Sequence, residues 1–238
     1  MSRPVLLIAG GSRGIGAATA RLAGARGYDV AVNYKSNAKA AASVLDAVKS
    51  GGGKAVAVQG DMVTEETIER VFDQAANELG PITHFVHSAG IGGKNSKLEA
   101  AIAQTLREVI DVNLYGGLLC ARAAVRRMST AHGGPGGSIV LLSSIASVTG
   151  GAGEYVFYAA AKGGIDALTN GLAREVVKEG IRVNDPARAD RNRDPRAGPA
   201  GAHHAAIADG PPRPARRNRR GDPVSAVGCG VLYHRRRA

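Results

Sequence analysis

Two side chains in the second half of the chain have the spacing of a proton-transfer pair. In the run Tyr158-Ala-Ala-Ala-Lys162 they are four residues apart, so they share one face if the run is helical. A free tyrosine, with a pKa of ~10, is a poor acid–base group at neutral pH. A neighbouring ammonium stabilises the phenolate and lowers that pKa. The pair therefore predicts proton transfer at an oxygen, although a merely exposed helix pair has the same spacing.

A glycine-rich turn near the start of the chain is suited to a phosphate. The run Ala9-Gly10-Gly11-Ser12-Arg13-Gly14-Ile15-Gly16 follows an apolar segment and opens a periodic one. Glycines let the backbone approach a pyrophosphate, and a helix N-terminus favours negative charge. The spacing is not G-x-G-x-x-G, and a structural turn is the alternative. The cofactor-binding residues predicted here are Gly10, Ser12, Arg13, Gly14, Ile15 and Gly16.

The charge at the end of the second predicted strand bears on the choice of cofactor. Enzymes that use NAD usually place an acidic residue there, bonded to the adenosine ribose. Here the strand ends Asn33-Tyr34-Lys35-Ser36, without a carboxylate. Arg13 and Lys35 are placed to meet a 2′-phosphate through charge-assisted bonds, which favours NADP(H) over NAD(H). Two solvated basic residues are the alternative.

The elements that must position these groups alternate along the chain. Short aliphatic runs predict strands at 4–9, 29–34, 54–58, 82–87, 138–143 and 181–184. Helical patterns occupy 15–26, 38–50, 65–79, 98–129 and 156–179, and the fourth reads as two helices that meet near Asn113. This order predicts an α/β fold with a doubly wound, Rossmann-like parallel sheet. Its strand-to-helix turns then share one edge, where a ligand binds.

Composition narrows the class of protein. The 238 residues suffice for one large α/β domain. No run of 18 apolar residues predicts a membrane span, and the opening segment lacks the layout of a signal peptide. Cys120 and Cys229 form neither a disulfide framework nor a metal-ligand spacing, so we expect no metal. We expect a cytoplasmic protein that binds neither a membrane nor nucleic acid.

The character of the chain changes after Asn184. Seven of the ten prolines lie beyond this residue. In the same segment, 12 arginines against 5 aspartates give +7 of the total charge of +11, so the first 184 residues carry +4. Few large aliphatic residues and no periodicity remain. We therefore predict an NADP-binding catalytic domain over 1–184 and a disordered Arg/Pro-rich tail over 185–238, with the last strand and one helix of the fold lost.

Taken together, the motifs from about Pro4 to Asn184 resemble the short-chain dehydrogenase/reductase family. The glycine turn is similar to its T-G-x-x-x-G-x-G, with Ala9 in place of Thr. The other matching segments, in family order, are Asp61, His87-Ser88-Ala89-Gly90, Asn113, Ser143-Ser144 and Tyr158/Lys162. The run from Ser144 to Tyr158 resembles bacterial members, in the branch of 3-oxoacyl reductases and sugar dehydrogenases.

The resemblance implies roles for individual residues. Tyr158 would be the general acid/base, and Lys162 would hold the nicotinamide ribose and lower the Tyr158 pKa. Ser144 would hydrogen-bond the substrate oxygen, and Asn113 would kink its helix and hold a water that leads to Lys162. The residues implied to contact the cofactor elsewhere are Asn33, Tyr34, Lys35, Asp61, Met62, Ala89 and Gly90.

The chain departs from the family pattern at three points. His87-Ser88 replaces Asn-Asn, and we expect His87 to be a packed strand-end residue rather than a catalyst. The catalytic serine of many members would align with Ile145, so we choose Ser144, with Ser143 as the fallback. The Pro-Gly turn that normally cups the nicotinamide is missing after residue 184.

The predicted function is reversible hydride transfer between NADP(H) and a carbonyl or secondary alcohol, by a homodimer or homotetramer as is usual in the family. The substrate classes implied are 3-oxoacyl thioesters and sugars or polyols. One alternative is a nucleotide-binding protein without turnover. Another is nucleic-acid binding through the Arg-rich tail, which would give a steep salt dependence.

A shifted reading frame would explain the tail. Back-translation of residues 185–197 with free choice of codons, read one base on, can give Thr-Arg-Pro-Gly-Leu-Ile-Ala-Thr-Glu-Ile-His-Ala. This peptide restores the Pro-Gly turn. Residues 208–216 and 227–238 can give two further family-like peptides in the same phase. We therefore expect the gene to encode the family's C-terminal segment in another frame.

Overall fold

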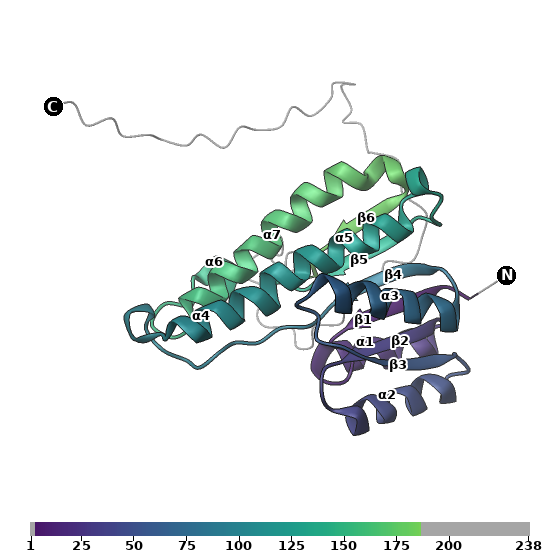
Figure 1. The fold of residues 1–238 in the computed structure, drawn as a ribbon, viewed down its shortest axis with the longest axis horizontal. Helices are drawn as coiled ribbons and strands as arrows, with labels where there is room; N and C mark the ends of the chain where they lie inside the picture. Colours follow the sequence, from purple (N-terminus) through teal and green to yellow (C-terminus); the bar gives the residue numbers. More distant parts are fainter. Residues whose placement is uncertain (1–2, 187–238) are drawn as a thin grey trace, which may run out of the picture. The chain divides into compact units, whose positions relative to one another are not determined.

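A computed structural model describes residues 3–186 and contains one six-stranded sheet in the order β3-β2-β1-β4-β5-β6 (Figure 1). Every pair of neighbouring strands is parallel. The strands are β1 Val5–Ala9, β2 Asp29–Tyr34, β3 Ala55–Gln59, β4 Ile82–His87, β5 Gly137–Leu141 and β6 Ile181–Asn184. The strand order reverses between β1 and β4, which confirms the doubly wound, Rossmann-like fold.

The strands form where uninterrupted aliphatic runs can be buried on both faces. All five residues of β1 are buried, and so are the first five of β2. The predicted bounds of β2, β4 and β6 agree with the structure, whereas β3 begins and ends one residue later than predicted. Strand β5 ends at Leu141, two residues before the predicted end, because Leu142 and Ser143 turn to contact Lys162.

Helices cover both faces of the sheet. They are α1 Gly14–Ala25, α2 Ala38–Ser50, α3 Glu65–Leu79, α4 Ala103–Ile110, α5 Gly116–Met128, α6 Ala146–Thr149 and α7 Val156–Val176. Helices α3, α5 and α7 share one core with the strands, through residues such as Phe72, Met128 and Ile165. Helices α1 and α2 pack on each other and on β1, β2 and β3. Side chains alternate along β1, so Leu6 and Ile8 point away from the core that contains α3, α5 and α7.

The long helical segment after β4 contains a π-helical turn. Helix α4 runs into the π-helical turn η2, Asp111–Tyr115, which continues directly into α5. The predicted meeting of two helices near Asn113 is therefore correct, and the junction is a wider turn rather than a break. Such turns insert one residue and redirect the side chains, and they recur at functional sites.

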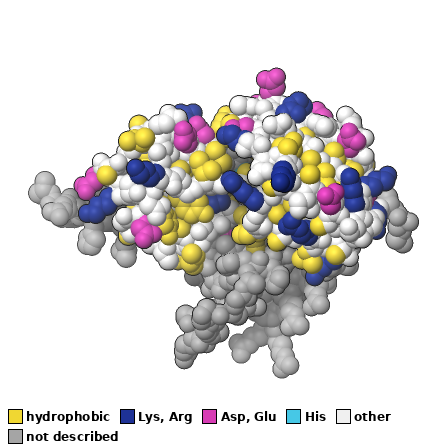
Figure 2. All heavy atoms as spheres, turned by 90° about the horizontal axis from the view of Figure 1, so that it is seen from below, with side chains coloured by type: hydrophobic (Ala, Val, Ile, Leu, Met, Phe, Trp, Pro, Cys, Tyr) yellow, Lys and Arg dark blue, Asp and Glu magenta, His cyan; other side chains and the backbone are white. Residues whose placement is uncertain are grey.

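Charges of both signs are interspersed on the face of the molecule in Figure 2. This distribution agrees with the small net charge of the first 184 residues. No helix within residues 3–186 is long and apolar enough to cross a membrane. The predictions for the tail lie outside the described residues, except at Asp185 and Pro186.

Candidate active site

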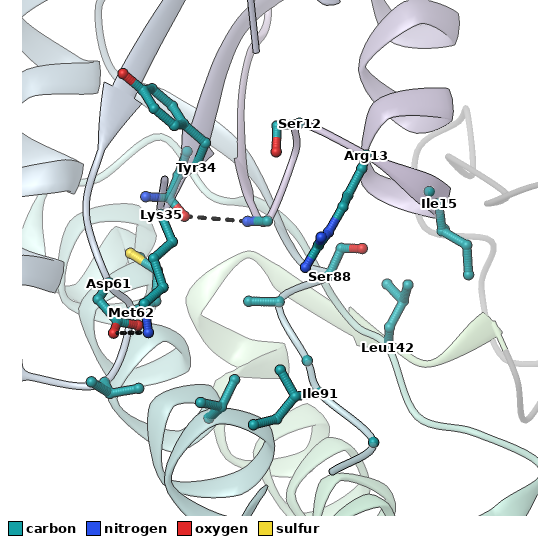
Figure 3. A pocket seen from close by; sticks show the side chains of 18 of the residues that line it. Ser12, Arg13, Ile15, Tyr34, Lys35, Asp61, Met62, Ser88, Ile91 and Leu142 are labelled. Carbon is teal, nitrogen blue, oxygen red and sulfur yellow. Dashed lines mark hydrogen bonds and ion pairs between the residues drawn. The ribbon is translucent and has the colours of Figure 1, made fainter. Parts of the chain in front are cut away.

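A cavity of about 850 Å³ lies at the carboxyl ends of the strands, where the strand order reverses (Figure 3). Its wall combines the glycine turn, the ends of β2 and β3, the segment after β4 and the end of β5. The predicted site residues that line it are Gly10, Ser12, Arg13, Gly14, Ile15, Asn33, Tyr34, Lys35, Asp61, Met62, Ala89, Gly90, Tyr158 and Lys162. Residues distant in sequence therefore meet at the edge that the strand pattern predicts.

The glycine turn is held in a shape that few other residues allow. Gly10 has φ +74°, and a Cβ there would lie 2.8 Å from the Cα of Ala89. Gly16 does not line the cavity, because it packs on the Gly10 carbonyl. Helix α1 begins at Gly14 without a side-chain cap, so its first N–H groups stay available at the cavity. The turn thus offers a helix N-terminus to an anion.

Asn33 joins the ends of three strands. Its side-chain oxygen accepts a bond from the Gly10 N–H at 3.2 Å, and its amide donates to the carbonyls of Val58 and Gly60. The side chain is buried. Although Asn33 lines the cavity, these three bonds assign its side chain to holding the wall in place.

The charged residues of the cavity differ in their partners. Lys35 Nζ lies 2.6 Å from the Asp61 carboxylate, and both side chains are partly exposed. Arg13 extends across the cavity toward Ser88, whereas the Tyr34 ring points away (Figure 3). Of Arg13 and Lys35, Arg13 is therefore directed into the space, while Lys35 is engaged by Asp61.

Lys162 is buried at the inner end of the cavity. Its Nζ donates to the Leu142 carbonyl at 2.7 Å and lies 5.8 Å from the centroid of the Tyr158 ring. Burial lowers the pKa of Lys162 to about 8, and Asp185 and Asp166 act in the opposite direction. The α7 helix places Tyr158 and Lys162 on one face, as their spacing predicts.

Asn113 locks the π-helical turn to the segment after β4. Its side-chain amide donates to the carbonyls of Ile91 and Val109, and its side-chain oxygen accepts from the Ile91 N–H. Gly90 lies so close that a Cβ there would be 2.6 Å from this oxygen. Asn113 is fully buried and lies behind the cavity wall, not on its surface.

The two candidate serines differ in what their hydroxyls do. The Ser143 hydroxyl donates to the backbone carbonyl of Lys162 at 3.0 Å. The Ser144 hydroxyl accepts a bond from the Ala146 N–H at 3.2 Å, which leaves its proton available. This geometry favours Ser144 over Ser143 as a donor to a substrate, although Ser143 rather than Ser144 lines the cavity.

His87 is fully buried at the end of β4, as expected for a packed strand-end residue. Its ring lies against Gly117 on α5, and neither ring nitrogen has a hydrogen-bond partner among the described residues. Burial, and secondarily the charge of Lys162, lowers its pKa to about 3. The imidazole is therefore neutral at physiological pH.

Several residues of the cavity wall are not among the predicted site residues. Ser88 and Ile91 flank the predicted Ala89 and Gly90, and Leu142 contributes the carbonyl that Lys162 contacts. Their position just after the ends of β4 and β5 is the signal that could have found them. Glu108 at the end of α4 and Asp111 at the start of the π-helical turn also line the cavity.

Comparison with known proteins places this geometry in context. The family model described as short chain dehydrogenase matches residues 4–187. The uncharacterized oxidoreductase YgfF of Escherichia coli is 45% identical over 180 residues, which cover 76% of this chain and 73% of that protein. The 3-oxoacyl-[acyl-carrier-protein] reductase of Bos taurus is 36% identical over 182 residues, covering 76% and 72%.

A solved structure has the same arrangement. The crystal structure of a dehydrogenase/reductase from Sinorhizobium meliloti aligns with a TM-score of 0.71 at 32% identity and covers 78% of this chain and 71% of that chain. The family match ends at residue 187, close to the change in composition after Asn184.

Proposed function

The chain belongs to the short-chain dehydrogenase family, and on that premise we propose that it transfers a hydride between NADP(H) and a carbonyl or secondary alcohol. The observation that carries the proposal is the placement of Tyr158 and Lys162 together at the inner end of a cavity that begins at the glycine turn. A proton-transfer group and a phosphate-binding turn on one cavity are what such a reaction needs.

The cavity wall fits a dinucleotide. The N-terminus of α1 and the close approach of Gly10 to Ala89 suit a pyrophosphate, and Met62, which is buried, suits a flat base beside Asp61. Ala89 and Gly90 would contact the cofactor through their backbone. When bound, the nicotinamide supplies a hydride in reduction and accepts one in oxidation.

The protein side chains would handle the proton and the position of the substrate. The Tyr158 hydroxyl donates its proton to the substrate oxygen in reduction and takes a proton from the alcohol in oxidation. The Lys162 ammonium stabilises the phenolate that remains and holds the ribose. Ser144 donates a hydrogen bond to the same substrate oxygen, and Asn113 keeps the wall around Lys162 in place.

The preference for NADP(H) rests on charge. Arg13 is directed into the cavity, and no carboxylate follows β2 directly. A 2′-phosphate offers Arg13 a charge-assisted bond that NAD(H) lacks. Lys35 would have to leave Asp61, or contact both groups at once, to contribute.

The substrate classes that we propose are 3-oxoacyl thioesters, by analogy with the Bos taurus reductase, and sugars or polyols. We also propose a homodimer or homotetramer built on the α5 and α7 helices. A cytoplasmic location and a lack of nucleic-acid binding stay predictions from the sequence.

For the tail we propose a shifted reading frame from residue 185. The end of the family match at residue 187 and the change in composition after Asn184 support it. The nucleotide sequence of the gene tests it directly. If its codons, read one base on from Asp185, give no Pro-Gly turn and no family-like continuation, the proposal is wrong.

Two measurements on the purified chain test the function. Titration calorimetry with NADPH and NADH gives cofactor binding, and NADPH consumption is followed with a 3-oxoacyl thioester and with oxidised sugars. We expect NADPH to bind and at least one carbonyl class to be reduced. Binding of NADPH without turnover on either class would favour a nucleotide-binding protein, and no binding of either cofactor would overturn the proposal.

A further inference from the structure

Asp185 is a buried carboxylate beside the proposed active site. It directly follows β6, whose register pairs Asn184 with Val140 of β5. This register brings Asp185 beside the end of β5, where its side-chain oxygen accepts a bond from the Ser143 N–H at 3.2 Å. The residue is only 6% exposed. A carboxylate is rarely buried to this extent unless a cation or several donors stabilise it.

A cation near Asp185 is Lys162, and the two side chains lie on opposite sides of the Leu142–Ser143 peptide unit. The Lys162 ammonium donates to the Leu142 carbonyl, and the N–H of the same peptide, that of Ser143, donates to Asp185. The peptide therefore lies between a positive and a negative group, with its carbonyl toward the cation and its N–H toward the anion. Both charges favour this one orientation of the peptide.

The groups that surround Lys162 come from three parts of the fold. Asp166 and Tyr158 lie on its own helix, His87 on β4, and Asp185 after β6. The imidazole of His87 is neutral, so the two carboxylates supply the favourable charge. Asp185 is bonded to the cavity wall through Ser143.

We propose that Asp185, as it stands in this chain, is a positioning residue for the proposed reaction: its carboxylate fixes the Leu142–Ser143 peptide against Lys162 and favours the Lys162 ammonium. The shifted frame proposed above would place threonine at residue 185, so this role belongs to the chain with aspartate there. The effect on catalysis rests on the proposed function, whereas the effect on the charge of Lys162 does not. Burial disfavours a charged lysine, and a nearby carboxylate offsets that cost. Without it, the pKa of Lys162 would fall further below its value of about 8.

The substitution Asp185→Asn separates charge from structure. Asparagine keeps an oxygen that can accept the Ser143 N–H, but it has no charge. We expect the pKa of Lys162, followed by NMR of 13C-lysine-labelled protein without cofactor, to fall by about one unit or more. The alkaline limb of the pH profile for NADPH-dependent reduction should move to lower pH by the same amount.

Four further variants act as controls. Asp185→Ala should give the same shift and also lower the thermal stability, because the Ser143 N–H loses its acceptor. Asp185→Glu keeps the negative charge, so the pKa of Lys162 should fall less than in Asp185→Asn. Asp185→Thr introduces the residue that the alternative reading frame would give. Threonine is uncharged, so the pKa of Lys162 should fall as in Asp185→Asn. Lys162→Arg identifies the resonance of Lys162.

Two outcomes would overturn the proposal. If Asp185→Asn leaves the titration of Lys162 unchanged, the carboxylate has no electrostatic role. If only Asp185→Ala has an effect, and that effect is a lower thermal stability, Asp185 only accepts a structural hydrogen bond. The NMR titration requires no turnover, so it decides the role of Asp185 even if no substrate is reduced. If the chain fails to bind or use NADPH while the pKa of Lys162 still falls in Asp185→Asn, only the proposed function is refuted.

Discussion

The two halves of the cavity are built differently: one presents mainly backbone, and the other depends on buried side chains. In the half built on β1, β2 and β3, the buried Asn33 side chain holds the strand ends together, much of the surface is backbone, and the charged side chains of Arg13 and Lys35 are exposed. In the half built on β4, β5 and β6, the decisive groups are the buried side chains of Asn113 and Lys162, each tied by hydrogen bonds to segments distant in sequence.

This difference predicts which substitutions should be costly. A backbone surface tolerates changes of side chain wherever the shape of the turn is kept, so the first half should determine affinity and cofactor choice. A buried network fails when one member is removed, because its partners stay buried without bonds. The second half should therefore determine turnover and stability together.

The largest effect is expected at Tyr158. Tyr158→Phe keeps the ring, and with it the edge-to-face contact with Tyr155, but removes the proposed proton donor. Turnover should fall by about 10²–10⁴-fold while NADPH still binds. Tyr155→Phe is the matched control and should keep most of the activity. Near-normal turnover in Tyr158→Phe would show that another group transfers the proton.

The next effect is expected at Asn113. Asn113→Ala removes three hydrogen bonds and leaves the partly buried Ile91 backbone groups and the buried Val109 carbonyl without this partner. The free energy of unfolding should fall by about 2–4 kcal/mol, measured by urea denaturation. Asn170→Ala, at an exposed position of α7, is the control and should change it little. Equal, small changes in both variants would contradict a network in the second half.

A pH-dependent effect is expected at His87. The unfolded chain takes up a proton below the ordinary pKa of 6.5, whereas the folded chain does so only near 3. Stability should therefore decrease as the pH falls from 6.5 toward 3, by about 2 kcal/mol at pH 5. His87→Asn should remove this component from the pH dependence of urea denaturation, and the exposed control His132→Asn should leave it. A steep acid loss that persists in His87→Asn would assign it to other groups.

The smallest effects are expected in the first half. Arg13→Ala should weaken NADPH about tenfold and NADH much less, because only NADPH carries the 2′-phosphate. Lys35→Ala should weaken NADPH only about threefold, since the ammonium already pairs with Asp61 at a partly exposed site. Calorimetry with both cofactors measures the two ratios. If Arg13→Ala weakens NADPH and NADH equally, Arg13 contacts a shared group such as the pyrophosphate.

The elements of the fold could be predicted from the sequence because each has a local cause. Aliphatic runs that are buried on both faces gave the strands, and the alternation with helices gave the parallel order. The Tyr158/Lys162 spacing and the glycine turn could also be recognised, because each is a short motif of consecutive residues. Their meeting at one cavity followed from the rule that carboxyl strand ends share an edge.

The fold class, the place of the cavity and the candidates for proton transfer could therefore be predicted from the sequence. The partners of those residues became known only from the packing of the folded chain. It pairs Lys35 with Asp61, commits the Ser143 hydroxyl to the Lys162 carbonyl, and sets Asp185 across one peptide from Lys162. The physical reason is that these contacts join residues from different strands and helices, whose approach depends on register and packing and leaves no periodic signal in the chain.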